Sequence, residues 1–168
     1  GLKAMMSAIF GAYADRREVQ AAIKSTVDET CDYCDKSEVW IDYVSDMGDG
    51  FDSTYTVAKL LSQKELVVDG ISTKMGNMLI LGGDQVYPVA TSEEYENRFQ
   101  GPYATANPRK KGDTDRPHMY ALPGNHDWYD GLASYLKLFC QERTIGNWKT
   151  QQERSYFAIK LPYGWWIW

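Results

Sequence analysis

The feature that most constrains the fold is a unit that occurs three times: a short apolar run that ends in a turn of glycine and polar residues. The runs are VWIDYV, MLIL and MYAL, at residues 39–44, 78–81 and 119–122, and each predicts a strand. Helical periodicity follows them, at residues 54–63, 93–99 and 128–146. Strands that alternate with helices build a parallel sheet through right-handed crossovers. We therefore predict an α/β fold made of βαβ repeats.

The turns that close the three runs carry chemically useful side chains. Asp46, Asp84 and Asn125 lie 38 and 41 residues apart, and His126 follows the last of them. Because ligands bind beyond the carboxyl ends of parallel strands, these four side chains are expected to converge on one site. Two carboxylates, an amide and an imidazole are hard donors that suit Mn, Fe, Zn or Mg. Asp84, on the middle strand, is placed to bridge two cations that hold a phosphate ester and activate a water.

Composition excludes several classes of protein. The chain has 168 residues, 43% of them hydrophobic, which fits one globular domain and excludes intrinsic disorder. A net charge of −5 gives no reason to expect nucleic acid or an anionic membrane as a partner. The apolar start at residues 4–14 is about half the ~20 residues that a spanning helix needs, so no membrane segment is expected. Three cysteines are too few for a disulfide scaffold and weakly favour a reducing, cytoplasmic compartment.

The two ends of the chain differ from its centre. An amphipathic helix is predicted at residues 2–24, and a polar loop follows, so we treat residues 1–36 as a separate N-terminal segment. Residues 156–161 and 165–168 predict a hairpin around a Pro-Tyr-Gly turn. A start at Gly1 and an end inside an aromatic run are expected of a piece cut from a longer protein, so residues 37–168 are taken as a C-terminally truncated domain.

The turn motifs DMG (residues 46–48), GDQVY (83–87) and GNHD (124–127) resemble those of the calcineurin-like metallophosphoesterase superfamily. Many members have Asp-x-His at the first motif. Here Gly48 replaces that histidine and Tyr87 closes the second motif, a combination similar to the purple acid phosphatase variant. The resemblance implies an αββα sandwich of which this chain carries the N-terminal half. Longer strings resemble a group of bacterial metallophosphoesterases over residues 9–168.

The resemblance also implies a set of metal ligands. Asp46 would bind the first metal, Asp84 would bridge, Asn125 would bind the second metal, and Tyr87 would be an iron(III) ligand at the first. Two divalent or mixed-valence ions, Mn, Fe or Zn, would fill the site. Two alternatives stay open. Because Pro88 follows it, the Tyr87 ring can instead point into the core, and the acidic residues at 49 and 52 lie close enough that Asp49 can replace Asp46, although the Asp-x-Gly register favours Asp46.

The implied reaction is hydrolysis of a phosphate ester, in which a metal-bound hydroxide attacks phosphorus. His126 would lie over the substrate and stabilise phosphoryl oxygens or protonate the leaving oxygen, and Asp127 would orient His126.

One departure from the superfamily pattern limits this expectation. Members complete the metal pair with histidines from a second sheet, and no histidine follows Asp127 here. The other histidine, His118, precedes the third strand at the end away from the turns and is expected to have a structural or surface role. The chain would thus hold about half the ligand set, so by itself it is expected to bind metals weakly or not at all and to be weakly active or inactive, with the activity in the longer parent. The alternative is a non-catalytic module that binds phosphate or a partner and keeps the fold without a complete site.

Overall fold

The computed structural model describes residues 33–109, 111–112 and 116–168. The helix expected at residues 2–24 lies outside this part of the chain, so the boundary proposed near residue 36 stays a prediction. Among the described residues, no helix is long and apolar enough to cross a membrane. Cys34 is disulfide-bonded, which departs from the reduced state that the cysteine count favoured, and Cys140 is free.

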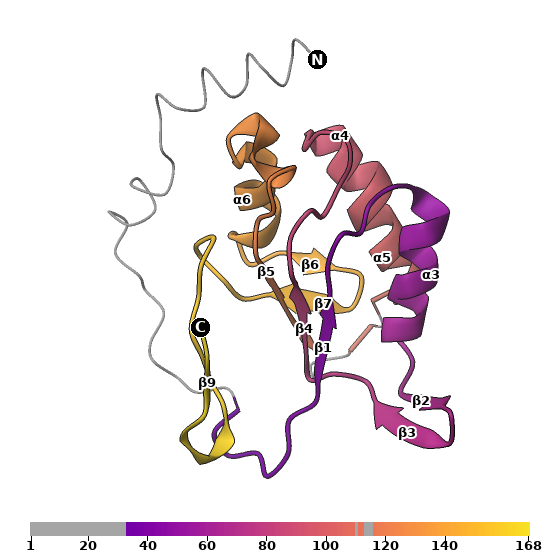
Figure 1. Ribbon diagram of the computed structural model, residues 1–168, viewed down its shortest axis with the longest axis vertical. Helices are drawn as coiled ribbons and strands as arrows, with labels where there is room; N and C mark the ends of the chain where they lie inside the picture. The colour runs from indigo at the N-terminus through magenta and orange to yellow at the C-terminus, as the bar shows by residue number, and fades with distance from the viewer. Residues whose placement is uncertain (1–32, 110, 113–115) are drawn as a thin grey trace.

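A five-stranded sheet forms the centre of the fold, in the order β1-β4-β5-β7-β6 (Figure 1). Its strands are β1 (Ile41–Val44), β4 (Met78–Leu81), β5 (His118–Ala121), β7 (Trp148–Thr150) and β6 (Thr144–Ile145). The first four are parallel, and β6 is an antiparallel edge strand. Val44 pairs with Leu81, and Leu81 pairs with Ala121, so β1, β4 and β5 end level with one another. The predicted α/β fold with a parallel sheet is confirmed.

Helices follow the strands as the sequence pattern predicts, with shifted bounds. They are α3 (Phe51–Leu61), α4 (Ser92–Tyr95), the π-helical turn η1 (Glu96–Gln100), α5 (Gly101–Ala106), the 3-10 turn η2 (Asp127–Asp130) and α6 (Ala133–Phe139). Pro102 stands in the first turn of α5, where its missing N–H is not needed.

Two hairpins lie outside the main sheet. The first joins β2 (Glu65–Val68) to β3 (Ile71–Lys74) and is not among the elements predicted above. The second joins β8 (Ile159–Lys160) to β9 (Trp166–Ile167) through the 3-10 turn η3 (Pro162–Gly164), as predicted. In Figure 1 the β8–β9 hairpin lies on the side of the sheet opposite α3 and α5.

The two faces of the sheet are covered differently. Leu79 and Leu81 of β4 pack on the side of the helices, in a core that includes Tyr95 and Phe99. The alternate residues Met78 and Ile80 pack in a second cluster with residues of the β8–β9 hairpin. All four residues of β4 are buried, which explains why its sequence is a continuous apolar run instead of an alternating one.

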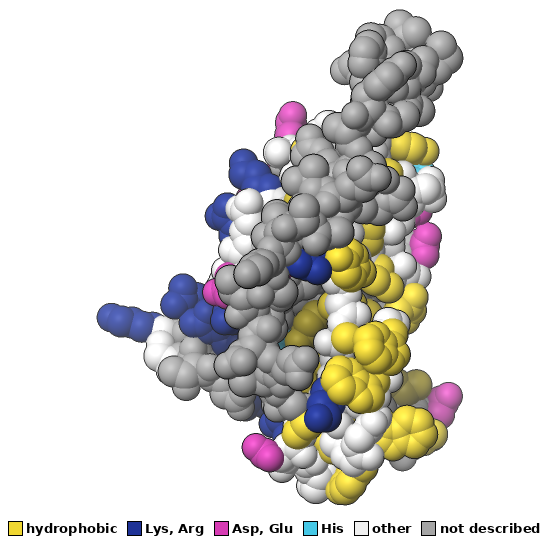
Figure 2. Space-filling model, turned by 90° about the vertical axis from the view of Figure 1, so that its left-hand side faces the viewer, with side chains coloured by type: hydrophobic (Ala, Val, Ile, Leu, Met, Phe, Trp, Pro, Cys, Tyr) yellow, Lys and Arg dark blue, Asp and Glu magenta, His cyan; other side chains and the backbone are white. Residues whose placement is uncertain are grey.

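The outer surface of the β8–β9 hairpin is aromatic. Tyr163, Trp165 and Trp168 are 81%, 72% and 86% exposed, and the Trp166 and Trp168 rings are stacked. Figure 2 shows hydrophobic side chains gathered on this side of the molecule. The tryptophans that follow the Pro-Tyr-Gly turn therefore do not contribute to the core of the sheet.

A half-buried carboxylate in β1 gives a pH-dependent prediction. Asp42 Oδ2 accepts a hydrogen bond from Gly76 N at 2.8 Å, and burial raises the pKa of Asp42 above its ordinary value. The contribution of Asp42 to the free energy of unfolding is therefore most favourable at low pH, when the carboxyl group is protonated. This contribution is lost as the pH rises through the folded-state pKa. Asp42→Asn keeps the acceptor and removes the buried charge, so it should raise the Tm at pH 7 by up to about 4 °C, and by less below pH 4. Thermal unfolding at both pH values checks this, with the exposed Asp35→Asn as control. A lower Tm at pH 7 would contradict it.

Candidate metal centre

The turn after β1 brings Asp46 to the turn after β4. Asp46 has a positive φ of 56°, which Asp adopts more readily than most residues, and its N–H donates to Gly83 O at 3.0 Å. Gly48 has a φ of 88°, and a Cβ there would lie 2.1 Å from Gln85 O. Its carbonyl accepts from Tyr87 N at 3.2 Å. Glycine at 48 is thus required for the two turns to pack backbone against backbone, and no histidine fits in its place.

Asp84 is hydrogen-bonded to the turn after β5. Its Oδ1 accepts from His126 N at 2.9 Å. A Cβ on Gly124 would lie 2.1 Å from the same Oδ1 atom, and a Cβ on Gly83 would lie 3.1 Å from the Gly124 Cα. Two glycines therefore let these turns approach closely, and Asp84 lies between the residues that follow β1 and those that follow β5.

Tyr87 joins the two aspartates. Its hydroxyl oxygen lies 3.0 Å from Asp46 Oδ1 and 3.0 Å from Asp84 Oδ2. Hydrogen bonds from Ser45 and Tyr87 lower the pKa of Asp46. Burial, followed by the hydrogen bonds to both carboxylates, raises the pKa of Tyr87 above its ordinary value. The alternative in which the Tyr87 ring points into the core is wrong, because the hydroxyl lies at the aspartates.

The chemistry of this oxygen cluster suits a cation. A phenol carries one proton, so it can donate fully to only one of the two carboxylates that contact it. The other carboxylate oxygen has no proton to accept from the same group, and two negative charges stay close together. A metal ion would neutralise both carboxylates and take the oxygens as ligands, which are the hard donors that Mn, Fe and Zn accept. The residues present therefore fit a metal.

His126 is held at this cluster by three neighbours. Its Nδ1 lies 2.9 Å from Pro88 O, and its ring lies 4.4 Å from the Tyr87 ring and 4.8 Å from the Tyr129 ring, centre to centre. A carbonyl oxygen only accepts, so Nδ1 carries the proton of this hydrogen bond. Nε2 is the ring nitrogen left for a ligand.

Asp127 lies beneath the turns and not beside the imidazole. It is fully buried and accepts from Gly124 N at 2.8 Å, from Gln85 N at 3.3 Å and from the Tyr95 hydroxyl. Burial raises its pKa. The sequence resemblance led us to expect that Asp127 orients His126, but the group hydrogen-bonded to that ring is the Pro88 carbonyl. Asp127 instead ties the turn after β4 to the turn after β5.

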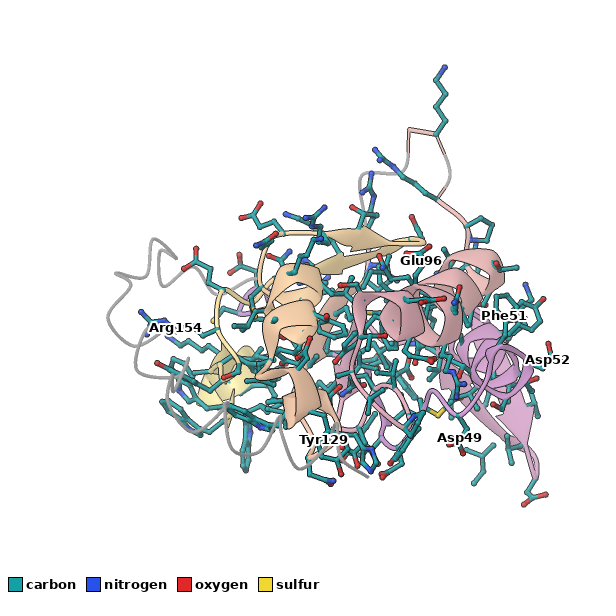
Figure 3. All side chains as sticks on the ribbon, turned by 90° about the horizontal axis from the view of Figure 1, so that it is seen from above. Asp49, Phe51, Asp52, Glu96, Tyr129 and Arg154 are labelled. Atoms are coloured by element: carbon teal, nitrogen blue, oxygen red, sulfur yellow. The ribbon has the colours of Figure 1, made fainter. Side chains whose placement is uncertain are left out.

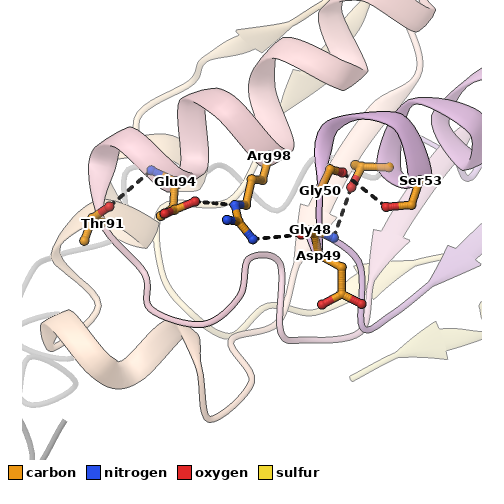
Figure 4. A network of polar contacts seen from close by, with 8 residues as sticks. Gly48, Asp49, Gly50, Ser53, Thr91, Glu94 and Arg98 are labelled. Carbon is orange, nitrogen blue, oxygen red and sulfur yellow. Dashed lines mark hydrogen bonds and ion pairs between the residues drawn. The ribbon is translucent and has the colours of Figure 1, made fainter. Parts of the chain in front are cut away.

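Asp49, the alternative to Asp46, occupies a different position. Its backbone carbonyl accepts from Arg98 Nη1 at 2.8 Å, and Arg98 also pairs with Glu94 (Figure 4). Its side chain is exposed, as is that of Asp52 on the first turn of α3 (Figure 3). The contact with Tyr87 belongs to Asp46, so the geometry favours Asp46 over Asp49.

The two remaining predicted residues, Asn125 and His118, lie at opposite ends of β5. Asn125 is exposed in the turn after β5, beside His126, whose N–H bonds to Asp84. His118 begins β5, at the end of the strand opposite the turns, and its Nδ1 lies 2.6 Å from the Tyr33 hydroxyl. Across the residues that the structure describes, no three His, Cys, Asp or Glu side chains gather closely enough to hold a metal. The cluster consists of two carboxylates and a phenol.

Sequence reasoning missed the residues that support the site from behind. These are Pro88, Gln85, Thr54, Tyr95 and Arg98. Pro88 and Gln85 act through their own backbone atoms, Thr54 and Arg98 bind backbone atoms of the turn after β1, and Tyr95 acts through a buried carboxylate. Such contacts depend on which way a helix or loop faces and leave no motif, although Thr91, which caps α4, marks where the helix that carries Tyr95 begins.

Comparison with known proteins assigns the chain to a family. The family model for calcineurin-like phosphoesterases matches residues 39–161, which include all three turns. The chain belongs to that family. Hydrolysis of phosphate esters is the chemistry that this family membership indicates, and divalent metal ions are the cofactors that the family generally uses. No curated protein and no solved structure matches the chain.

Proposed function

We propose that this chain forms one side of a dinuclear metal centre that hydrolyses a phosphate ester. The observation that carries the proposal is the position of the Tyr87 hydroxyl, 3.0 Å from a carboxylate oxygen of both Asp46 and Asp84. Asp46 and Tyr87 would hold the first metal, Asp84 would bridge, and Asn125 would hold the second. When bound, the metals would polarise the phosphate and lower the pKa of a coordinated water.

His126 is the proposed general acid. Because the Pro88 carbonyl occupies Nδ1, only Nε2 is free to reach a substrate, and the protonated ring can donate from Nε2 to the leaving oxygen. The Tyr87 and Tyr129 rings, which both contact the imidazole, restrict its rotation. The imidazole is therefore held in one orientation by neighbours that take no part in the proposed reaction.

The experiment is an assay of metal-dependent hydrolysis. p-Nitrophenyl phosphate and its bis ester are offered, with Mn²⁺, Fe²⁺ or Zn²⁺ added, to the chain and to any longer form of the protein. We expect release of nitrophenol that a chelator abolishes. Absence of metal-dependent release from every form, together with retained phosphate binding, would support the alternative function, a non-catalytic binding module. The lack of three clustered His, Cys, Asp or Glu residues in the described ranges favours that alternative as the second candidate.

Replacement of His126 separates metal binding from catalysis. In the form of the protein that turns over, His126→Ala should lower kcat by about 10²- to 10⁴-fold, because proton transfer to the leaving oxygen is lost, and should leave metal affinity nearly unchanged. His118→Ala is the matched control, since that histidine lies at the far end of β5 and should leave kcat unchanged. Equal loss in both variants, or loss of the metals from His126→Ala, would contradict the role proposed for His126.

A further inference from the structure

We propose that Tyr95 is a positioning residue for the metal pair, because its hydroxyl fixes the carboxylate that sets the separation of Asp84 and Asn125. The inference rests on the proposed function and adds to it a residue from a helix outside the three turns. Tyr95 is the last residue of α4 and comes before η1. Its side-chain hydrogen bond goes to Asp127, which is not one of the proposed ligands.

The connection runs through Asp127. One oxygen of Asp127 accepts from the Tyr95 hydroxyl, and the other accepts from Gly124 N at 2.8 Å. Both oxygens also lie 3.3 Å from Gln85 N. Gln85 directly follows Asp84, and Gly124 directly precedes Asn125. Asp127 therefore binds the backbone next to each ligand, and its own position fixes the distance between the two turns.

Tyr95 is suited to hold this carboxylate still. Its side chain is 1% exposed, and its ring packs edge to face against Phe99 and Phe139. A hydroxyl on a rigid, buried ring cannot follow a carboxylate that moves, so it constrains Asp127 to one place. Without that hydroxyl, Asp127 would keep only its two backbone donors, and the turns could separate by small amounts that a metal pair does not tolerate.

The chain offers a matched control for removing one tyrosine hydroxyl. Tyr135 is also fully buried, and its hydroxyl donates to Ala121 O within β5 and accepts from Gln152 Nε2 at 3.0 Å. It therefore braces the strand and not the turns. Tyr95→Phe and Tyr135→Phe each delete one buried hydroxyl, and they differ in whether the lost bond leads to a residue that bonds the ligand-bearing turns.

The test measures Mn²⁺ affinity by titration calorimetry and the coupling of bound Mn²⁺ ions by electron paramagnetic resonance, together with the free energy of unfolding without metal. Tyr95→Phe should lower affinity by about 10- to 100-fold, the usual effect of losing a group that holds a metal ligand in place, and should alter the coupled spectrum. Tyr135→Phe should destabilise the fold by a similar amount but change affinity less than about threefold.

The outcomes separate the inference from the proposed function. If neither the chain nor any longer form of the protein binds Mn²⁺ at this edge, the proposed function fails and the inference fails with it. If the unaltered chain binds Mn²⁺ and both variants bind equally well, the inference alone is overturned. Should Tyr95→Phe not fold, hydrogen exchange in the unaltered chain decides: Mn²⁺ must slow exchange of the Gln85 and Gly124 amides, and unchanged rates would overturn the inference.

Discussion

Asp84→Ala is expected to lower the affinity of the chain for Mn²⁺ by more than about 100-fold, beyond the 10- to 100-fold that follows from loss of a supporting group. Asp84 contacts its own turn and the turn after β5: its Oδ2 accepts from the Tyr87 hydroxyl, and its Oδ1 accepts from His126 N. Its loss would remove the proposed bridging ligand and release the constraint on the turn after β5. Titration calorimetry of the unaltered chain and the variant measures the change.

Asp49→Ala is the control for this experiment, because Asp49 is acidic, exposed and only three residues from Asp46. It should change Mn²⁺ affinity by less than about threefold if its carboxylate is not a ligand. Circular dichroism of Asp84→Ala without metal establishes that the fold is retained. Unchanged Mn²⁺ affinity in a folded Asp84→Ala variant would show that the bridging assignment is wrong. A loss of affinity larger than about threefold in Asp49→Ala would indicate that Asp49 is a ligand of the first metal.

Gly48→Ala is expected to reduce the free energy of unfolding by about 2–5 kcal/mol, combining backbone strain with overpacking. The φ of 88° is unfavourable for alanine, and the new Cβ would lie 2.1 Å from Gln85 O and 2.7 Å from the Val86 Cα. Both obstacles are backbone atoms of the turn that carries Asp84, so relief of the clash must move that turn. Mn²⁺ affinity should therefore fall together with stability. Urea unfolding gives the first quantity.

Gly70→Ala is the control that separates the cost of backbone strain from the cost of the steric clash. Gly70 has a φ of 79°, close to that of Gly48, but a Cβ there would meet nothing within 4 Å. This control should cost about 1–2 kcal/mol and leave Mn²⁺ affinity unchanged. If both glycines cost the same, the close contact of the turns after β1 and β4 is not a source of strain. Gly48→His would be at least as destabilising as Gly48→Ala, so restoring the Asp-x-His pattern is not expected to add a ligand.

The sequence predicted the parts of the fold that repeat. The bounds of β1, β4 and β5 agree with the three apolar runs to within two residues. The central strands β4 and β5 are largely buried and have continuous or nearly continuous apolar sequences, whereas the edge strand β1 is partly exposed and includes Asp42. The β2–β3 hairpin was missed although Asp69-Gly70 is a strong two-residue turn signal, and both residues have positive φ. The apolar residues flanking that turn are exposed, so the sequence on either side lacks the alternating pattern of a half-buried strand.

The third helix ends earlier than its sequence pattern predicts. The periodicity after Trp128 was extended to Gly146, but α6 ends at Phe139 and a short hairpin, β6–β7, follows. Its two-residue loop is Gly146-Asn147, a composition typical of hairpins. β7 then enters the sheet beside β5. A strand of three residues is too short to show an alternating pattern, so only its partner in the folded sheet defines it.

The meeting of the turns was predictable, but the roles of their side chains were not all predictable. Topology alone places the carboxyl ends of neighbouring parallel strands at one edge, and Asp46 and Asp84 do share a hydrogen-bond partner there. The burial of Asp127 and the use of the Pro88 carbonyl by His126 depend on side-chain directions within turns. These directions depend on how closely the turns pack, as at Gly124 and Asp84, which the spacing of the motifs does not reveal.

The most direct test of the metal centre is an anomalous difference map from crystals of the protein soaked in MnCl₂. We predict a peak between the carboxylates of Asp46 and Asp84, within bonding distance of the Tyr87 oxygen, and a second peak on the side of Asp84 that faces Asn125. A map with ordered aspartates and no peak at this edge would contradict the account, and so would manganese bound only elsewhere on the molecule.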